Sequence, residues 1–336
     1  MRAAPAMSQI LVEELSKTYR IAEREPGVWG ALKGVAHRRW RTVEALSAVS
    51  FQMAEGELVG LIGPNGAGKS TTIKILSGIL EPSSGRCEVG GLVPWRQRIA
   101  HVARIGVVFG QRTQLWWDLP VIEGFDLLRD IYRVPQDRYA ATRDELVALL
   151  RLEKLLDQPV RQLSLGQRMR CEIAAALLHQ PSLLFLDEPT IGLDAPSKLA
   201  VREFVGRLNR ERGVTVILTT HDMHDIEALA ERVIVIGAGR ILADGSFDDL
   251  RAGVLAERRL FVDFAGEAPA LDLPEVRVLA RDGRQLELAF DPRRIGAPDL
   301  IARIVADHPV DDIHVEEPLI EEVIARFYDL HGASES

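Results

Sequence analysis

The sequence has few cysteines, no long apolar run and no basic excess, and each absence excludes a class of protein. Its 336 residues include only two cysteines, Cys87 and Cys171, so it has neither a disulfide framework nor the spacing of a zinc site, and a reducing cytosol fits best. No run of about 18 apolar residues occurs, and the N-terminal MRAAPAMSQI lacks the apolar stretch of a signal peptide. We therefore do not expect the chain to cross a membrane alone, and either Met1 or Met7 could be its start. The net charge of −8 disfavours a specific nucleic-acid binder, although it leaves room for a local basic patch.

What is present indicates an α/β protein with two domains. Hydrophobic residues make up 47% and charged residues 27% of the chain, which allows a substantial core. Apolar strands such as SLLFLDE and VTVILTT alternate with helical patterns as far as VIVIG, and this alternation predicts a parallel sheet covered on both faces. No repeat and no second phosphate loop occurs, so one nucleotide-binding core is expected.

The pattern changes after GRILADGSFDDLRAG, where short strands and two helices follow. We expect a first domain over residues 1–250 and a separate small α/β domain over 251–336. Within the first, residues 112–180 form a helical segment, in which DELVALLRLEKLL predicts a helix over 144–156.

GPNGAGKST, residues 63–71, fits the phosphate-loop pattern between an apolar strand and a helix that begins near Lys69. Gly63, Gly66 and Gly68 let the backbone turn tightly and present N–H groups to phosphates, at the positive end of the helix dipole. Lys69 would reach the β- and γ-phosphates, and the hydroxyl of Ser70 would bind Mg²⁺.

Two later strands end in residues suited to the same chemistry. LLFLDEP places Asp187 and Glu188 at the carboxyl end of a buried strand, where Asp187 would hold Mg²⁺ and Glu188 would orient or deprotonate an attacking water. The next strand ends in TTHDM, so His221 would lie at the same edge and contact the γ-phosphate. HDMH also suggests a metal pair of His221 with His224, but no further ligand cluster supports that alternative.

A second anion-binding helix start occurs in LSLGQRMR, residues 163–170. Ser164 and the amides around Gly166 would present donors at the beginning of an amphipathic helix. Because the chain has one phosphate loop and one such helix start, two copies that share their sites are indicated. A simple capped helix is the alternative for this motif alone.

At these residues the chain resembles the ATP-binding cassette family, the ATPase subunits of ABC transporters, over roughly residues 8–245. The resemblance implies a P-loop NTPase fold, with a RecA-like parallel sheet core, an antiparallel β-subdomain and a helical subdomain at about 112–180. It also implies ATP and Mg²⁺ as ligands, and two cassettes that meet head to tail, as a homodimer or with a paralogous cassette.

The family's functional positions fall on specific residues of this sequence. For catalysis the resemblance implies Glu188, His221, Gln111 and Lys69, and for the metal Ser70, Asp187 and Gln111. For the nucleotide it implies the adenine-stacking Tyr19, the Walker A residues, the signature and the D-loop, which comprise Tyr19, Gly63, Asn65, Gly66, Gly68, Lys69, Ser70, Thr71, Ser164, Gly166, Gln167 and Asp194.

Two positions depart from the family pattern. Leu165 stands where the signature most commonly has glycine, so the backbone there must tolerate a side chain; we do not expect a loss of activity. Gly110 stands where glutamine often begins the Q-loop, and we assign the metal and permease-sensing role to Gln111, with Gln114 as the alternative.

The resemblance favours the ATPase subunit of a membrane transporter, at the cytoplasmic face of the cell membrane, which powers an integral-membrane permease. The pattern is closest to exporters of drugs, lipids, polysaccharides or sodium; a soluble cassette protein acting on ribosomes or DNA is the alternative. Arg112, Leu115, Trp116, Trp117 and Asp118 are expected in a groove for the permease, unless both tryptophans pack in the core.

The segment over residues 21–42 is a basic insertion with two tryptophans. Lysine, arginine and tryptophan suit a membrane interface, so we expect contact with a lipid surface through residues 24–41, or else a solvated loop.

Overall fold

The computed structural model describes residues 8–23, 39–110, 112–220, 222–253, 257–271, 273–316 and 320–330. The chain divides into two units, Met1–Gly245 and Ser246–Ser336, and each is described by itself. No helix within the described ranges is long and apolar enough to span a bilayer.

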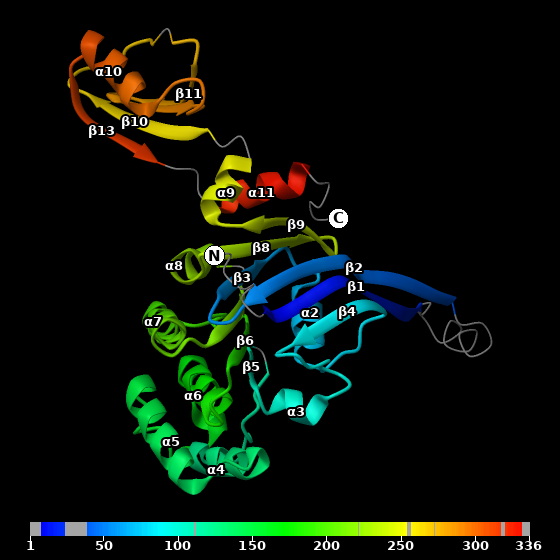
Figure 1. Cartoon of the computed structure of the whole chain (residues 1–336). Helices are drawn as coiled ribbons and strands as arrows, with labels where there is room; N and C mark the ends of the chain where they lie inside the picture. Colours follow the sequence, from blue (N-terminus) through cyan, green and yellow to red (C-terminus); the bar gives the residue numbers. More distant parts are fainter. Residues whose placement is uncertain are drawn as a thin grey trace, which may run out of the picture. The chain divides into compact units, whose positions relative to one another are not determined.

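A six-stranded sheet forms the centre of the first unit (Figure 1), in the order β5-β6-β7-β3-β8-β9. The first five strands are parallel, and β9 pairs antiparallel with β8. All five residues of β3 and of β7 are buried, as expected of strands covered on both faces. The strands are β3 Leu58–Ile62, β5 Ile105–Phe109, β6 Leu183–Asp187, β7 Thr215–Thr219, β8 Arg232–Gly237 and β9 Arg240–Gly245.

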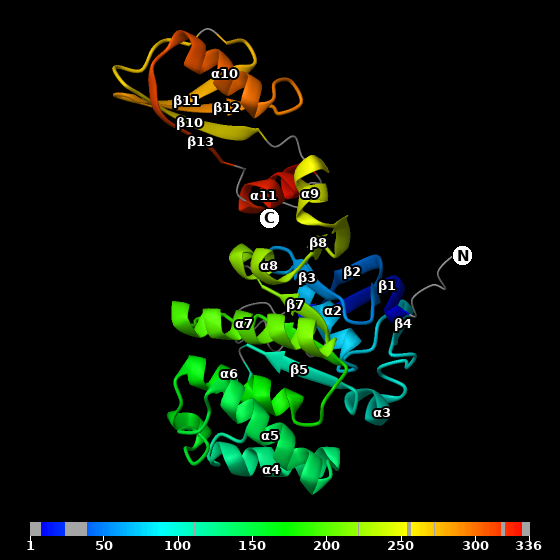
Figure 2. The same ribbon diagram turned by 60° about the vertical axis from the view of Figure 1, so that its left-hand side comes forward.

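Helices cover this sheet and extend away from one end of it. α2 packs against β6 of the sheet and against the neighbouring antiparallel strands, whereas α7 packs on α8 and α6, as Figure 2 shows. α4, α5 and α6 pack together beyond α7. The helices are α2 Lys69–Leu76, α3 Arg98–Val102, α4 Val121–Tyr132, α5 Gln136–Leu150, α6 Leu165–Leu177, α7 Ala195–Arg212 and α8 Met223–Leu229, with a 3₁₀ turn at Val160–Gln162.

Three antiparallel strands pack on the other side of α2, in the order β2-β1-β4. They are β1 Ser8–Glu23, β2 Arg39–Ala54 and β4 Ser84–Val89. β1 and β2 pair as far as Glu23 opposite Arg39, so the ends of the predicted insertion at 21–42 continue this hairpin as strands. Most of the segment expected to contact lipid, residues 24–38, lies outside the described residues.

The helix predicted over 144–156 was wrong at both ends, since the observed α5 covers Gln136–Leu150. α5 begins after Pro135 and ends at Leu150, because Arg151 adopts the left-handed conformation with φ 54°. The amide of Leu152 then donates to the carbonyl oxygen of Val147 over 2.9 Å, which closes the helix. The apolar spacing that suggested a longer helix continues past Leu150, because Leu152 and Leu155 are also buried although they lie after the helix.

The second unit contains a four-stranded antiparallel sheet in the order β11-β12-β10-β13, with α10 packed on it. Leu260, Val262, Leu286, Leu288 and Leu300 form its core. α9 packs against α11. The elements are α9 Phe247–Gly253, β10 Arg258–Phe264, β11 Val276–Asp282, β12 Gln285–Phe290, α10 Ala297–Asp307, β13 Val310–Glu316 and α11 Ile320–Leu330. The predicted α/β fold, a parallel sheet core with an antiparallel subdomain and a helical subdomain, is confirmed.

Candidate functional site

The phosphate loop connects β3 to α2 and depends on glycines for two different reasons. Gly66 and Gly68 have φ of 81° and 113°, in the region that side chains disfavour. Gly63 has no such backbone, but a Cβ there would lie 2.3 Å from the carbonyl oxygen of Ile236. Gly68 caps α2, which begins at Lys69 as predicted, so the free N–H groups of the helix start face the loop.

Lys69 is almost fully buried beside this loop, with 6% of its surface exposed. Its ammonium group donates to the carbonyl oxygens of Gly63, over 2.5 Å, and Pro64, over 3.1 Å. Burial lowers the pKa of Lys69, and the carboxylates of Glu188 and Asp187 act in the opposite direction. The two acids thus favour a charged ammonium group where phosphate would bind.

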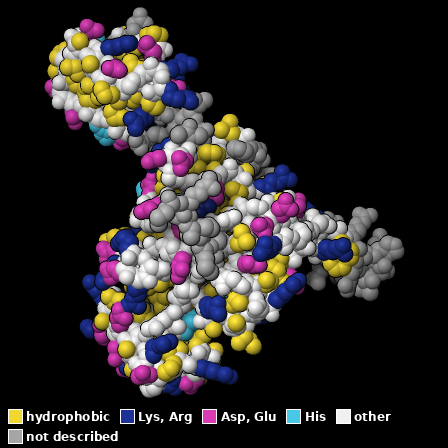
Figure 3. All heavy atoms as spheres, viewed as in Figure 1, with side chains coloured by type: hydrophobic (Ala, Val, Ile, Leu, Met, Phe, Trp, Pro, Cys, Tyr) yellow, Lys and Arg dark blue, Asp and Glu magenta, His cyan; other side chains and the backbone are white. Residues whose placement is uncertain are grey.

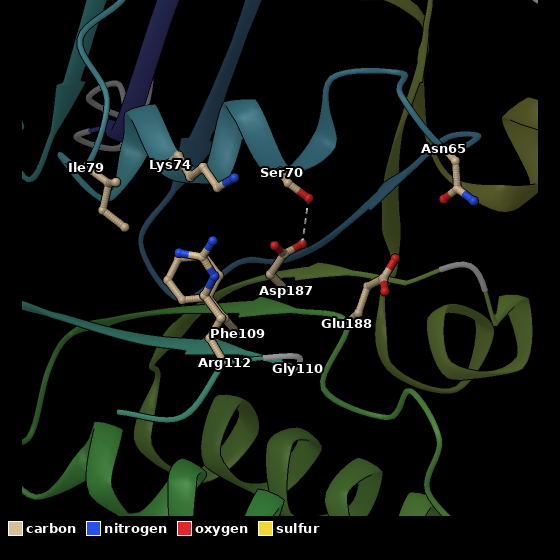
Figure 4. A pocket seen from close by; sticks show the side chains of 9 residues that line it. All are labelled: Asn65, Ser70, Lys74, Ile79, Phe109, Gly110, Arg112, Asp187 and Glu188. Carbon is tan, nitrogen blue, oxygen red and sulfur yellow. Dashed lines mark hydrogen bonds between the residues drawn. The ribbon is translucent and has the colours of Figure 1, made fainter. Parts of the chain in front are cut away.

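The acidic end of β6 meets the first turn of α2 (Figure 4). The hydroxyl of Ser70 donates to Asp187 Oδ1 over 3.4 Å, and the hydroxyl of Thr219, at the end of β7, donates to the same oxygen over 2.6 Å. Sequence reasoning missed Thr219, although its position at the end of the strand next to β6 was a usable signal. The Asp187 carboxylate at the end of β6 therefore accepts hydrogen bonds from two elements that are distant in sequence, α2 and β7.

Glu188 follows Asp187 in a backbone conformation that is uncommon for a residue with a side chain, with φ 56°. Its N–H donates to both the carbonyl oxygen, over 2.9 Å, and the hydroxyl, over 3.2 Å, of Thr219. This left-handed residue ends the strand direction abruptly, and its side chain projects into the pocket in Figure 4.

Of these groups, Ser70, Asp187 and Glu188 line one open pocket of about 370 Å³. The sequence did not single out Lys74, Ile79 or Phe109, which contribute apolar surface and a further cation to its wall. Arg112, which was predicted to lie in the permease groove, also lines this pocket. The pocket residues are Asn65, Ser70, Lys74, Ile79, Phe109, Gly110, Arg112, Asp187 and Glu188.

Gly110 has a steric reason to be glycine. Its N–H donates to the carbonyl oxygen of Asp187 over 2.8 Å, and a Cβ at Gly110 would lie 2.2 Å from the carbonyl oxygen of Glu188. The end of β5 is thus pressed against the backbone of the two acidic residues. A glutamine at position 110 would therefore push the end of β5 away from the backbone of Asp187 and Glu188.

The signature residues form a capped helix start elsewhere in the unit. The Ser164 hydroxyl accepts from the N–H of Gln167 over 3.2 Å, and the Gln167 side chain accepts from the N–H of Ser164 over 2.9 Å. A Cβ at Gly166 would lie 2.5 Å from Ser197 Oγ, at the start of α7. Asp194 caps α7 through the N–H of Ser197 over 3.1 Å. Hydrogen bonds from the Ser197 side chain and from this N–H hold the pKa of Asp194 below its usual value.

Leu165 is the first residue of α6 and has an ordinary helical backbone. A Cβ at Gly192 would meet its side chain at 2.9 Å, so Leu165 packs against the loop that follows Glu188. The backbone therefore accepts a side chain at the position where the family pattern has glycine.

Tyr19 lies on β1, where it pairs with Val43 of β2. The Lys17 ammonium group is 5.4 Å from the centre of the Tyr19 ring. β2 reaches the phosphate loop two residues further on, because a Cβ at Gly68 would lie 2.7 Å from the carbonyl oxygen of Ala45. This places Tyr19 on strands that run past the start of α2.

Two predicted catalytic residues, Gln111 and His221, lie outside the described residues. The side-chain amide of Gln114 donates to the carbonyl oxygen of Glu172 over 3.0 Å, so this alternative to Gln111 is engaged with α6. Among the residues that the structure describes, no group of three or more His, Cys, Asp or Glu side chains could hold a metal ion.

The adjacent tryptophans are not core residues. Trp116 is 38% exposed and Trp117 is 49% exposed, so the alternative that both pack in the core was wrong. The guanidinium carbon of Arg168 lies 5.8 Å from the centre of the Trp117 ring. Leu115, which directly precedes them in the sequence, is buried.

Known proteins share this arrangement. A family model described as ABC transporter matches residues 46–191. The chain is 34% identical over 301 residues to the daunorubicin resistance ATP-binding protein DrrA3 of Streptomyces coeruleorubidus, covering 86% of this chain and 92% of that protein. It is 35% identical over 278 residues to the methionine import ATP-binding protein MetN 2 of Enterococcus faecalis, covering 80% of each.

Among solved structures, the ATP-binding cassette MJ0796, in a dimeric post-hydrolysis state bound to ADP and Pi, aligns with a TM-score of 0.58 and 27% identity. The alignment covers 70% of this chain and 98% of that one. With the phosphate loop, the acidic end of β6 and a relative of this identity over most of its length, the chain belongs to the ATP-binding proteins of ABC transporters, the cassette ATPases that bind and hydrolyse ATP.

Proposed function

We propose that this chain hydrolyses ATP to power a separate membrane permease, through ATP-driven pairing of two cassettes. One observation carries the proposal: Asn65 and Ser70 of the phosphate-loop segment and the acidic end of β6 line one pocket, whereas Ser164, Gly166 and Gln167 are not among its lining residues. A second helix start built to bind an anion is thus available to a nucleotide held by another cassette. A homodimer or a pair with a paralogous cassette satisfies this geometry, and the dimeric MJ0796 cassette supports it.

The donor set at the end of β6 fits Mg²⁺. The Ser70 hydroxyl and the Asp187 carboxylate are hard oxygen donors 3.4 Å apart, and Mg²⁺ uses few protein ligands beside phosphate oxygens and waters. We assign Ser70, Asp187 and Gln111 to the metal, which would neutralise charge on the phosphates when bound. Gln111 is preferred to Gln114 because the amide of Gln114 already holds α6.

The remaining polar groups have separate roles in the reaction. Lys69 binds the β- and γ-phosphates, and Glu188 orients or deprotonates the attacking water, since its left-handed backbone directs the carboxylate into the pocket. His221 contacts the γ-phosphate, Tyr19 stacks on adenine, and Asp194 belongs to the interface between cassettes. Asn65, Thr71 and the loop N–H groups complete the phosphate site.

We assign the permease contact to Trp116 and Trp117. Both rings are substantially exposed at the entrance to the helical subdomain, and exposed aromatic side chains are the residues that most often anchor protein partners. On the face shown in Figure 3, the described side chains of both charge signs are interspersed, which does not favour nucleic acid as the partner.

Export is the direction that we propose. DrrA3 and the linearmycin resistance protein LnrL of Bacillus subtilis are named for drug resistance, which supports export, whereas the MetN proteins are named for methionine import. The permease, a separate chain, selects the substrate.

Three further assignments belong to the same proposal. The cassette acts at the cytoplasmic face of the cell membrane, the small domain over residues 251–336 is accessory or dimer-stabilising, and residues 24–41 contact lipid. Liposome pelleting of the chain with and without residues 24–41 tests the last, and equal pelleting would end that assignment.

The permease is tested by purifying the tagged chain from detergent-solubilised membranes of its own cell and identifying the bound proteins. We expect a polytopic membrane protein in the purified complex. Ribosomes or DNA-repair proteins, recovered without a permease, would place the ATPase among soluble cassette proteins instead.

The pairing of cassettes is tested with Glu188→Gln, which removes the base and keeps the side-chain shape. We expect this variant to form an ATP-bound dimer in gel filtration, because hydrolysis no longer releases the two copies. The matched control is Glu153→Gln at an exposed glutamate, which should stay like the wild type. A Glu188→Gln chain that remained monomeric at saturating ATP would contradict the role of Glu188.

A further inference from the structure

A buried acid on α6 is not used by the mechanism above. Glu172 is 3% exposed, and its neighbours along the helix are Cys171 and Ile173, both fully buried. Burial raises the pKa of Glu172, while hydrogen bonds from the loop after β5 act against that rise. An acid in such surroundings needs a reason, because an apolar side chain would avoid the cost of burying its charge.

The loop after β5 supplies partners for the whole carboxylate. One oxygen of Glu172 accepts from the Thr113 hydroxyl, and the other accepts from the N–H of Gln114 over 3.1 Å. The side-chain amide of Gln114 returns to the main-chain oxygen of Glu172 over 3.0 Å, and the N–H of Leu115 donates to the Thr113 hydroxyl over 3.1 Å. Three consecutive loop residues are therefore tied to one turn of α6.

The tied segment joins the pocket wall to the exposed aromatic pair. Arg112, which lines the pocket, precedes it, and Trp116 follows it. Arg168 on α6 reaches the Trp117 ring, and the N–H of Arg161 donates to the Trp117 carbonyl oxygen over 3.0 Å, so the aromatic end is held to the same helix and to the turn before it.

The same helix carries the signature at its start. Ser164 precedes Glu172 by eight residues, about 12 Å along a rigid α-helix. The start of the loop is attached differently, since the N–H of Gly110 donates to the carbonyl oxygen of Asp187 and the N–H of Arg112 to that of Phe109, over 2.8 and 3.1 Å. The loop after β5 is therefore hydrogen-bonded first to the acidic end of β6 and to the end of β5, and a few residues later to α6.

We propose that Glu172 is a positioning residue for the ATPase cycle. It fixes residues 113–115 to α6, so that the aromatic pair and the helix start at Ser164 move as one body beside the pocket wall, whose Arg112 is attached to the end of β5. This inference rests on the proposed function for the roles of Ser164 and of the aromatic pair. Glu172 itself is not among the residues that line the pocket.

The test compares Glu172→Gln, Thr113→Val and the double variant in the full chain, with Glu153→Gln as the control. Hydrogen exchange should accelerate across residues 112–117, because Glu172→Gln weakens the acceptor of the Gln114 amide and Thr113→Val removes the acceptor of the Leu115 amide. The kcat for ATP should fall about tenfold, the factor expected for one lost charge-assisted hydrogen bond, with KM within about twofold of the wild type. The double variant should be no slower than the slower single variant, since both changes release the same contact.

Two outcomes would overturn the inference. Faster exchange with wild-type kcat would make Glu172 a packing residue only, and unchanged exchange would mean that it does not hold the loop. If Glu172→Gln fails to fold, Thr113→Val still decides, because it leaves the buried acid in place and removes one donor. None of these measurements needs a permease, so a failure of the transporter assignment is distinguishable from a failure of this one.

Discussion

Gly110→Ala should slow ATP hydrolysis by displacing Glu188. The backbone of Gly110 has no positive φ, so alanine is acceptable there in conformation, and the effect is one of space. The new Cβ would begin 2.2 Å from the Glu188 carbonyl oxygen and would need at least 3.0 Å, a displacement of about 0.8 Å. Misplacing a catalytic group by about 1 Å costs on the order of 100-fold in rate, so we expect kcat to fall between about 10- and 100-fold.

The assay is steady-state ATP hydrolysis at saturating Mg²⁺, together with thermal unfolding of the same preparations. Gly266→Ala is the matched control, because no atom lies within 4 Å of a Cβ at that position and its φ is not positive. A Gly110→Ala chain with kcat within about threefold of the wild type would refute the reasoning, since the contact would then relax without moving Glu188.

Three further predictions concern the same unit. Thr219→Val removes the donor to Asp187, so kcat/KM should fall about tenfold and the Mg²⁺ requirement should rise; a wild-type Mg²⁺ titration would argue against the contact. Ser164→Ala removes the helix cap and should lower the free energy of unfolding by about 1 kcal/mol in urea, whereas an unchanged midpoint would mean that the cap contributes nothing. Burial lowers the pKa of both His101 and His179, so the unfolded chain binds protons first and stability should fall as pH falls below about 6.5, by at most about 1.4 kcal/mol per histidine per pH unit; a midpoint independent of pH between 7.5 and 5.5 would contradict this.

The sequence predicted the elements that carry the site because their signals are local. The phosphate loop needs glycines at fixed intervals, and the helix at Lys69 follows directly from the pattern. An apolar strand that ends in two acids identifies Asp187 and Glu188 without any knowledge of their neighbours. The capping box of Ser164 and Gln167 is also a local feature, because its two residues lie three positions apart in the sequence.

Other features depend on contacts between distant segments, and the sequence could not reveal them. Apolar spacing extended the predicted helix to residue 156, because burial of Leu152 continued after the left-handed Arg151 had ended α5. Arg112 was assigned to a partner groove, and the sequence did not reveal that it also lines the pocket. Whether the tryptophans at 116 and 117 lay inside or outside remained open until the packing of α4 and α6 was known.

The sequence by itself determined the fold class, the nucleotide chemistry and the residues at each strand end, since these follow from short patterns of residue type and spacing. Only the tertiary structure decided why Gly110 must be glycine, which hydroxyl supports Asp187 and where the buried acid Glu172 finds its partners. Each of these depends on atoms brought together from strands and helices tens of residues apart. Such contacts are selected by how side chains and backbone fill space after folding, which no local pattern records.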